Sequence, residues 1–302
     1  MHDLLSDRSV SAPELVEALR TSAPMSFGDP TVVALVGEFA TRLLRPAITR
    51  LHPELASLGF FLRRSEISRV LESFATSDDL VRTPRGLVVH VPPANVDTIF
   101  VYSWAMSVLA GNANVVRLPE SLSPETARLV NLVTDVVADA GEGDRQIFCN
   151  YPYGQPIEAR IAAHFDLRVI WGGDATVAAI RRVALPPSAR ELTFADRWSL
   201  TAIGARAVAG LEDAGVITLA EQLYNDIYWF DQLGCSSPRL ALWIGDADVV
   251  TAARARLWPA LAAVAEARGY RPEVAARLAR ELFIHRAVLD GPVVGRSDYG
   301  PA

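Results

Sequence analysis

The sequence contains little cysteine and histidine, which limits the kinds of site it can form. Its two cysteines, Cys149 and Cys235, are far apart, and its five histidines are scattered singly along 302 residues. Neither set has the short spacings of a structural zinc site. A chain of this length also buries a substantial core without disulfides. We therefore expect no structural zinc site and no disulfide framework.

Three common nucleotide and hydrolase motifs are absent as well. The chain contains no G-x-G-x-x-G, no G-x-x-x-x-G-K-[ST] and no G-x-S-x-G. The first marks an ordinary dinucleotide site, the second a P-loop and the third the nucleophile elbow of serine hydrolases. Any nucleotide must therefore be held in another way, and a serine hydrolase is disfavoured.

Long apolar runs and clusters of basic residues are also absent. No stretch approaches eighteen uninterrupted apolar residues, and the acidic segment 1–7 lacks the apolar run of a signal peptide. The formal net charge is −6 and the arginines are dispersed, which argues against nucleic acid as a partner, because phosphate binding depends on clustered Lys and Arg. We expect a cytoplasmic protein without a membrane span.

The first eighty residues have helical periodicity. A capped helix start at Ser11, with Pro13 and Glu14 following, precedes amphipathic stretches over 30–45 and 65–74. From Gly86 onward the pattern changes to short β-branched runs that alternate with amphipathic stretches. The predicted strands are 87–91, 114–118, 146–149 and 167–171, and the predicted helices are 98–109, 124–138, 156–163 and 175–182.

Repeated β-α units with nearly continuous apolar strands predict a parallel sheet with helices on both faces. Such sheets bind ligands at the carboxyl ends of their strands. After residue 186 the pattern predicts a further α/β region. It consists of a long helical run over 211–230, a turn over 231–238, a strand over 240–244 and helices over 249–268 and 272–282.

Cys235 lies on that turn, between Gly234 and the sequence Ser-Ser-Pro. A thiol on a small-residue turn is accessible to a substrate and to backbone N–H donors, which makes it a candidate nucleophile. Free cysteine is nevertheless among the most buried residue types, so a structural role is the alternative. Cys149 has neighbours that alternate like those of a buried strand, and we assign it to the core.

Two loops that follow predicted strands carry chemistry of their own. Gly172, Gly173 and Asp174 join a strand to a helix, where backbone N–H groups bind an anion such as a pyrophosphate. The alternative is a plain tight turn with Asp174 as the helix N-cap. Asn95 follows the first strand, where its amide is placed to donate to an oxyanion, although a turn asparagine is the commoner case.

These loops together resemble the aldehyde dehydrogenase superfamily. The segments 86–95 and 109–117, with Pro-Pro-Ala-Asn and Ala-Gly-Asn-Ala-Asn-Val-Val-Arg, are similar to the opening of its cofactor domain. The segments 166–177, 190–197 and 231–238 resemble the fatty acyl-CoA reductases of bioluminescence, the LuxC family. The resemblance covers roughly residues 50 to 245 and keeps the order of the family's motifs.

The resemblance implies an aldehyde dehydrogenase-like α/β fold in three parts. A helical N-terminal region would span 1–80, a parallel-sheet nicotinamide-cofactor-binding domain 81–190 and an α/β catalytic domain 191–302. Relatives continue well beyond the point where this chain ends, so the catalytic domain is expected to be truncated. The superfamily also implies a homo-oligomer, and the family an acyl-transferring partner protein.

Site residues follow from the resemblance position by position. Catalytic roles fall on Cys235 as nucleophile, Asn95 as oxyanion donor and Glu191 as the general base of aldehyde-oxidising relatives. The implied cofactor-binding residues are Pro93, Arg117, Glu120, Trp171, Gly172, Gly173, Asp174 and Val177. The usual lysine is Arg117 here, which suits the extra phosphate of NADP, whereas Glu120 suits the ribose hydroxyl of NAD.

The implied reaction is reduction of an acyl thioester to an aldehyde. The Cys235 thiolate would attack the thioester of CoA or of a carrier protein, and NADPH, or NADH, would supply the hydride. The first alternative is aldehyde oxidation, in which Glu191 activates water. A second is a catalytically inactive subunit that binds acyl carriers or another protein.

Overall fold

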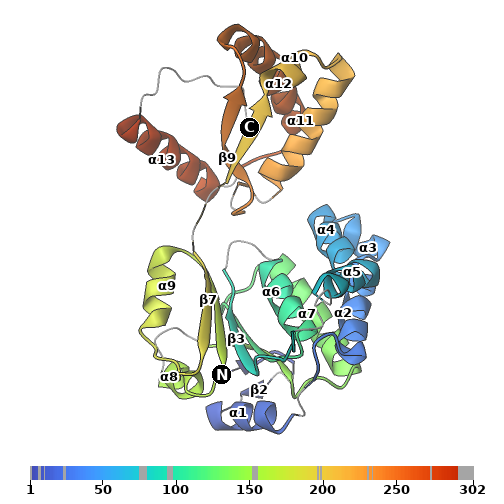
Figure 1. Cartoon of the computed structure of the whole chain (residues 1–302), viewed down its shortest axis with the longest axis vertical. Coiled ribbons are helices and arrows are strands. Elements are labelled where there is room, and N and C mark those ends of the chain that lie inside the picture. The colour runs from blue at the N-terminus through green and yellow to red at the C-terminus, as the bar shows by residue number, and fades with distance from the viewer. Residues whose placement is uncertain are drawn as a thin grey trace. The chain divides into compact units, whose positions relative to one another are not determined.

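The chain divides into two compact units, Met1–Asp196 and Arg197–Ala302. The computed structural model describes residues 2–5, 8–9, 11–22, 25–74, 80–93, 98–151, 156–195, 197, 199–229, 231–232, 234–272 and 274–291. The first unit holds both the N-terminal helices and the predicted sheet (Figure 1). The second unit holds Cys235. Each unit is described by itself below.

A mixed sheet forms the centre of the first unit. In the described residues its strand order is β2-β1-β5-β4-β3-β6-β7. The five neighbouring strands β5, β4, β3, β6 and β7 run parallel. The strands are β1 (His2–Asp3), β2 (Arg8–Ser9), β3 (Leu87–Val91), β4 (Ala113–Leu118), β5 (Gln146–Asn150), β6 (Leu167–Trp171) and β7 (Arg190–Phe194). The prediction of a parallel sheet is confirmed for these five strands.

The two N-terminal strands depart from the helical prediction for residues 1–80. β1 pairs antiparallel with β5, and β2 pairs antiparallel with β1. Their backbone groups thereby satisfy the edge of β5, which a parallel neighbour does not cover. Two residues are too few to leave a period-2 pattern in the sequence, so the sequence could not reveal them.

Helices cover both faces of this sheet, as Figure 1 shows for α6 and α7 on one side and α8 and α9 on the other. Alternate residues of each strand face opposite sides. Val116 and Phe148 pack with α2, α6 and α7, whereas Val115, Ile147 and Cys149 pack with α1 and α8. The helices are α1 (Ala12–Thr21), α2 (Pro30–Leu43), α3 (Pro46–Thr49), α4 (Pro53–Phe61), α5 (Arg64–Phe74), α6 (Ile99–Leu109), α7 (Pro124–Asp139), α8 (Pro156–Ala162) and α9 (Asp174–Arg181).

The predicted capped start of α1 is confirmed. Ser11 N–H donates to Glu14 Oε2 at 2.9 Å, and Glu14 N–H donates to Ser11 Oγ at 3.4 Å. This reciprocal pair is a capping box, which satisfies two donors that a helix start otherwise leaves without partners. The periodic stretches over 30–45 and 65–74 likewise form α2 and α5.

Gly111 holds the N-terminal segment against the turn between α6 and β4. Its φ is +86°, and a Cβ at this position would lie 2.6 Å from the carbonyl oxygen of Met25 and 2.9 Å from that of Ser26. Gly28 N–H donates to the carbonyl oxygen of Leu109 at 2.8 Å. Only glycine accommodates both the left-handed backbone and this close approach.

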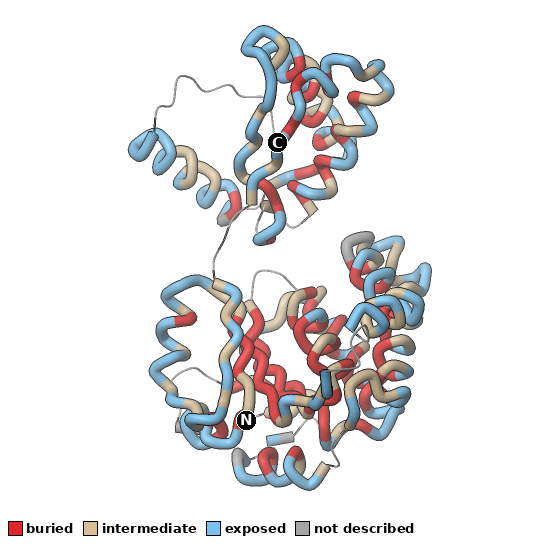
Figure 2. Tube along the Cα trace, viewed as in Figure 1, coloured by how far each residue is buried: buried red, intermediate tan, exposed pale blue. Residues whose placement is uncertain are grey.

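The second unit is built on two parallel strands, β8 (Ser199–Gly204) and β9 (Pro238–Ile244). Ile203, Ala241 and Trp243 face a core with the helices α10 (Ala205–Ala209), α11 (Asp213–Tyr228) and α12 (Ala247–Ala267). Helix α13 (Val274–Asp290) follows. The opposite face of the strands is exposed and apolar, and Figure 2 colours each described residue of the chain by its burial. This face consists of Leu200, Leu240, Leu242 and Ile244.

No helix in the described part of the chain combines the length and the apolar character that a membrane crossing requires.

Candidate functional site

The carboxyl ends of β3, β4 and β6 meet at one edge of the first unit's sheet, because these strands are parallel and neighbouring. Pro93 follows β3 and is half-buried, and Glu120 follows β4 and is exposed. Asn95 lies within 94–97, outside the described residues. The Trp171 to Asp174 turn follows β6. The structure thus brings most of the predicted cofactor-binding residues to one edge.

Trp171 ends β6 and forms an aromatic stack at this edge. Its ring lies 3.8 Å from the ring of Phe194, centroid to centroid, with an angle of 11° between the planes. Its Nε1–H donates to Ser103 Oγ at 3.1 Å, and Tyr102 approaches it edge-on at 6.5 Å. Phe194 and Tyr102 are partly exposed, so the edge presents a flat aromatic surface whose orientation is fixed by a hydrogen bond.

The turn after Trp171 leads directly into the N-terminus of α9. Gly172 N–H donates to the carbonyl oxygen of Phe194 at 3.1 Å, and Val177 N–H donates to that of Gly173 at 3.0 Å. Gly173 is the N-cap and Asp174 is the first helical residue, so the alternative of Asp174 as N-cap is wrong. Gly173 is exposed, and nothing lies within 4 Å of a Cβ built on it. An anion therefore has room to approach the first turn of α9.

Arg117 lies deeper than the resemblance implied. It is 5% exposed, Nη2 donates to the carbonyl oxygen of Tyr151 at 2.8 Å, and the guanidinium lies 5.2 Å from the centre of the Tyr151 ring. Arg117 lines a small cavity of about 40 Å³ between the sheet and helices α8 and α9, together with Val89, Val91 and Ile180. The guanidinium is therefore held by the protein, while Glu120 is the exposed charge after β4.

Glu191 lies away from the carboxyl edge. It pairs with Arg168 in the β6–β7 register, three residues before Trp171 and Phe194, which is about 10 Å along the strands. Its Oε2 accepts from Arg168 Nη2 at 2.6 Å, and its Oε1 accepts from Arg181 Nε at 2.6 Å. Burial acts to raise the pKa of Glu191, but the bonds from Arg181 and Arg168 lower it overall. This geometry favours a structural role for Glu191, as the shared partner of two arginines, over the role of general base that the resemblance implied.

A buried polar network supports the aromatic stack from below. His90 is 1% exposed, with Nδ1 2.8 Å from Ser103 Oγ and Nε2 2.9 Å from Asn114 Oδ1. The Asn114 amide donates to Gln146 Oε1 at 2.9 Å, so its Oδ1 accepts from His90 Nε2–H. Nδ1 then accepts the Ser103 hydroxyl, whose oxygen accepts from Trp171. Burial lowers the pKa of His90 to about 4, which keeps this neutral tautomer.

Cys235 is exposed at the tip of a hydrogen-bonded turn in the second unit. Ser237 N–H donates to the carbonyl oxygen of Gly234 at 3.1 Å. Ser199 Oγ, on β8, donates to the carbonyl oxygen of Cys235 at 2.6 Å. Gln232 Nε2 donates to the carbonyl oxygen of Pro238 at 3.3 Å, which closes the base of the loop. The sequence-based prediction of an accessible thiol is confirmed.

Cys149 is buried, whereas Cys235 is exposed. Cys149 is 0% exposed on β5, and burial raises the pKa of its thiol to about 12. A buried thiol with so high a pKa is neither accessible nor ionised. The assignment of Cys149 to the core is confirmed.

Several residues of these sites were not found from the sequence. Tyr102, Ser103 and Phe194 surround Trp171, and Ser199 contacts the Cys235 turn. Each lies on a different element from its partner, and none belongs to a motif. The sequence signal for Phe194 was its position in the segment 190–197, which carries part of the resemblance but in which only Glu191 was given a role.

Comparison with protein families matches residues 58–267 to the model of LuxC, an acyl-CoA reductase. This match covers well over half of the chain. The chain belongs to the LuxC acyl-CoA reductase family. No protein with curated annotation matches it.

Solved structures show that this LuxC-family chain has an aldehyde dehydrogenase-like α/β fold. One is a putative aldehyde dehydrogenase from Burkholderia cenocepacia, at 20% identity and a TM-score of 0.58, with 83% of this chain and 56% of that one covered. Another is P. syringae indole-3-acetaldehyde dehydrogenase in complex with NAD⁺ and IAA, at 16% identity and a TM-score of 0.60, with 83% and 54% covered.

A third similar structure is betaine aldehyde dehydrogenase from Staphylococcus aureus in complex with NAD⁺, at 16% identity and a TM-score of 0.52. The match covers 84% of the LuxC-family chain and 53% of the betaine aldehyde dehydrogenase chain. The chain thus spans about half the length of these solved structures. At these identities the likeness establishes the fold.

Proposed function

We propose that this LuxC-family protein reduces an acyl thioester, carried by CoA or by a carrier protein, to the aldehyde through an acyl-enzyme on Cys235. The observation that carries the proposal is the exposed thiol at the tip of a hydrogen-bonded turn. Small-residue turns of this kind let a carbonyl group approach both the sulfur and the backbone N–H groups. Family membership supplies the substrate class.

The chemical step on Cys235 is a thioester exchange. The thiolate attacks the acyl carbonyl carbon, and the carbonyl oxygen takes the negative charge. Asn95 and the Cys235 backbone N–H are the proposed donors to that oxyanion. The tetrahedral intermediate collapses by expelling the carrier thiolate, which leaves the acyl group on sulfur. Ser199 fixes the backbone of the turn through its bond to the Cys235 carbonyl.

We propose that the carboxyl edge of the first unit binds a nicotinamide dinucleotide. The aromatic stack and the room at the N-terminus of α9 offer surfaces for rings and phosphates. Trp171, Gly172, Gly173, Asp174 and Val177 would hold the cofactor, together with Pro93, Arg117 and Glu120. When bound, the reduced cofactor supplies the hydride that releases the aldehyde.

The choice between NADPH and NADH turns on Arg117 and Glu120. Arg117 is held by Tyr151, whereas Glu120 is exposed after β4. A carboxylate at this point accepts from a ribose hydroxyl and repels a 2′-phosphate. We therefore propose that NADH serves at least as well as NADPH.

The proposal is tested by intact mass spectrometry and by cofactor oxidation. Wild type, Cys235→Ala and Cys149→Ala are mixed with a long-chain acyl-CoA without cofactor, and NADH or NADPH is then added. We expect one acyl adduct on wild type and on Cys149→Ala, and cofactor oxidation by both. An acyl adduct on Cys235→Ala, or equal oxidation rates for Cys235→Ala and wild type, would overturn the proposal.

A further inference from the structure

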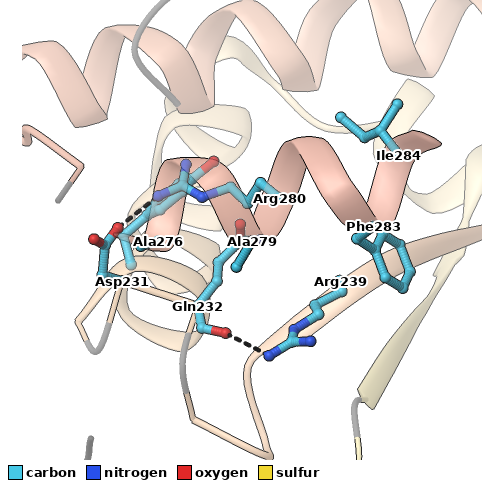
Figure 3. A pocket seen from close by; sticks show the side chains of 9 residues that line it. Asp231, Gln232, Arg239, Ala276, Ala279, Arg280, Phe283 and Ile284 are labelled. Atoms are coloured by element: carbon cyan, nitrogen blue, oxygen red, sulfur yellow. Dashed lines mark hydrogen bonds and ion pairs between the residues drawn. The ribbon is translucent and has the colours of Figure 1, made fainter. Parts of the chain in front are cut away.

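A pocket lies at the base of the Cys235 loop in the second unit. It has a volume of about 230 Å³ and is bounded by Asp231 and Gln232 of the loop and Arg239 of β9 on one side and by α13 on the other (Figure 3). Ala276, Phe283 and Ile284 of α13 give it an apolar wall. The pocket therefore combines an apolar surface with charged groups at both ends of the loop that carries the nucleophile.

The charges in this pocket do not cancel. Asp231 Oδ1 accepts from Arg280 Nη2 at 2.5 Å and from the hydroxyl of Tyr270, so the carboxylate is committed to α13 and its neighbour. Arg239 forms no ion pair within the described residues. Its Nη2 donates only to the carbonyl oxygen of Gln232, at a long 3.4 Å (Figure 3). One guanidinium charge is therefore left without a carboxylate.

A buried donor beside the pocket supports a binding role as well. Arg280 Nε is buried without a hydrogen-bond partner among the described residues. An unsatisfied buried donor beside a cavity is typical of functional sites. Asp231 and Gln232 have φ values of 51° and 61°, and their N–H groups donate to the carbonyl oxygens of Tyr228 and Ile227, both at 3.1 Å. Their left-handed backbone is thus explained by the C-terminus of α11.

We propose that this pocket binds the 4′-phosphate end of the pantetheine arm of the thioester substrate, with Arg239 contacting the phosphate. This inference rests on the proposed function. A guanidinium binds phosphate through two parallel N–H bonds, and the apolar wall suits the dimethyl group beside that phosphate. Arg239 lies four residues from Cys235, at most about 14 Å along the chain, and a pantetheine arm is long enough to span this distance. CoA and acyl carrier proteins both present the same phosphate.

The test compares thioesters with and without the phosphate. Acylation of Cys235 is timed by mass spectrometry with acyl-phosphopantetheine and acyl-pantetheine, for wild type, Arg239→Gln and the control Arg277→Gln, an exposed arginine of α13. We expect wild type and the control to prefer the phosphorylated substrate about tenfold, and Arg239→Gln to lose the preference while it reacts with acyl-pantetheine at the wild-type rate. Equal preference in all three proteins overturns the proposal.

A binding measurement separates this proposal from the proposed function. Calorimetric titration with phosphopantetheine and with pantetheine needs no acyl transfer. We expect Arg239→Gln to lose about tenfold in affinity for phosphopantetheine only, with Arg239→Lys in between. If wild type binds phosphopantetheine no better than pantetheine, the subsite is wrong even if acylation occurs. If binding discriminates but no acyl adduct forms, the subsite stands and the reaction is wrong.

The carrier is identified by a final comparison of acyl-CoA with an acyl carrier protein. Both carry the 4′-phosphate, so Arg239→Gln is expected to slow acylation by both, by similar factors. An effect confined to acyl-CoA would place the contact on the nucleotide end and overturn the assignment to the pantetheine phosphate.

Discussion

Ser199 donates a hydrogen bond of 2.6 Å to the carbonyl oxygen of Cys235, and thereby joins β8 to the turn that carries the thiol. The bond fixes the peptide between Cys235 and Ser236 and thereby restrains the backbone that carries the thiol. Ser199→Ala is expected to lower the rate of acylation about fivefold and the free energy of unfolding by about 1 kcal/mol.

The control for this variant is Thr218→Ala. Thr218 also donates to a backbone carbonyl, that of Ala214 on α11, on the same unit. It is expected to leave the acylation rate unchanged. If circular dichroism shows that Ser199→Ala is folded and its acylation rate is unchanged, the bond does not position the turn.

The two cysteines should differ in their rate of reaction with a thiol reagent. With a chromogenic disulfide at pH 8, we expect one thiol per native chain to react and two in denaturant, because Cys149 is fully buried and burial raises its pKa to about 12. Cys235→Ala should show no fast thiol, and Cys149→Ala should behave as wild type. Two fast thiols in the native protein would contradict the structure.

Glu191→Gln tests whether Glu191 has a structural role as the shared partner of two arginines. The neutral amide leaves the buried Arg168 without its charged partner, so the free energy of unfolding in urea should fall by about 2 kcal/mol. Cofactor oxidation with acyl-CoA should be unchanged, because no water needs activation in that direction. Loss of aldehyde oxidation in the folded variant, with acylation unchanged, would return Glu191 to the role of general base.

Glu66→Gln is a matched control, since Glu66 also binds two arginines, Arg63 and Arg69, on the surface of α5. Those partners are largely exposed, and exposed ion pairs contribute less than about 1 kcal/mol. An equal loss of stability in both variants would mean that burial of Arg168 does not matter.

His90 predicts a pH dependence of stability. Its folded pKa of about 4 lies below the ordinary value of 6.5, so below pH 6.5 the unfolded chain takes up a proton that the folded protein refuses. Its contribution to stability is complete above pH 6.5 and is lost as the pH falls toward 4, up to about 3 kcal/mol. The direct measurement is the His90 ring resonance by NMR, which should not titrate between pH 8 and 5.5. A midpoint near 6.5 would refute the buried tautomer.

The parallel core of the fold was predictable from the sequence because its strands are short, apolar and bounded by Gly, Pro or Asn. The predicted bounds of β3 and β6 are confirmed to the residue. β7 was missed because it is an edge strand whose residues alternate between exposed and half-buried, with charged side chains at its start. β8 was missed because Ser199 and Thr201 interrupt its apolar pattern.

Site residues could be proposed from the sequence only where neighbouring residues in one short segment form the candidate site. Cys235 and the Gly172–Asp174 turn each lie within one short motif. The motif around Glu191 did not reveal that Arg168 and Arg181 converge on it, and its role as general base stays a prediction. Arg239 and Arg280 lie 41 residues apart in the printed sequence and meet only through the fold.

Gly111 has a consequence for how the first unit unfolds. Because Met25 and Ser26 press their carbonyl groups against it, and Gly28 is bonded to Leu109, the segment between α1 and α2 is attached to the turn at the amino end of β4. The N-terminal helices therefore cannot detach without breaking contacts beside the central strands. The helices and the sheet should lose structure together, in a single cooperative transition.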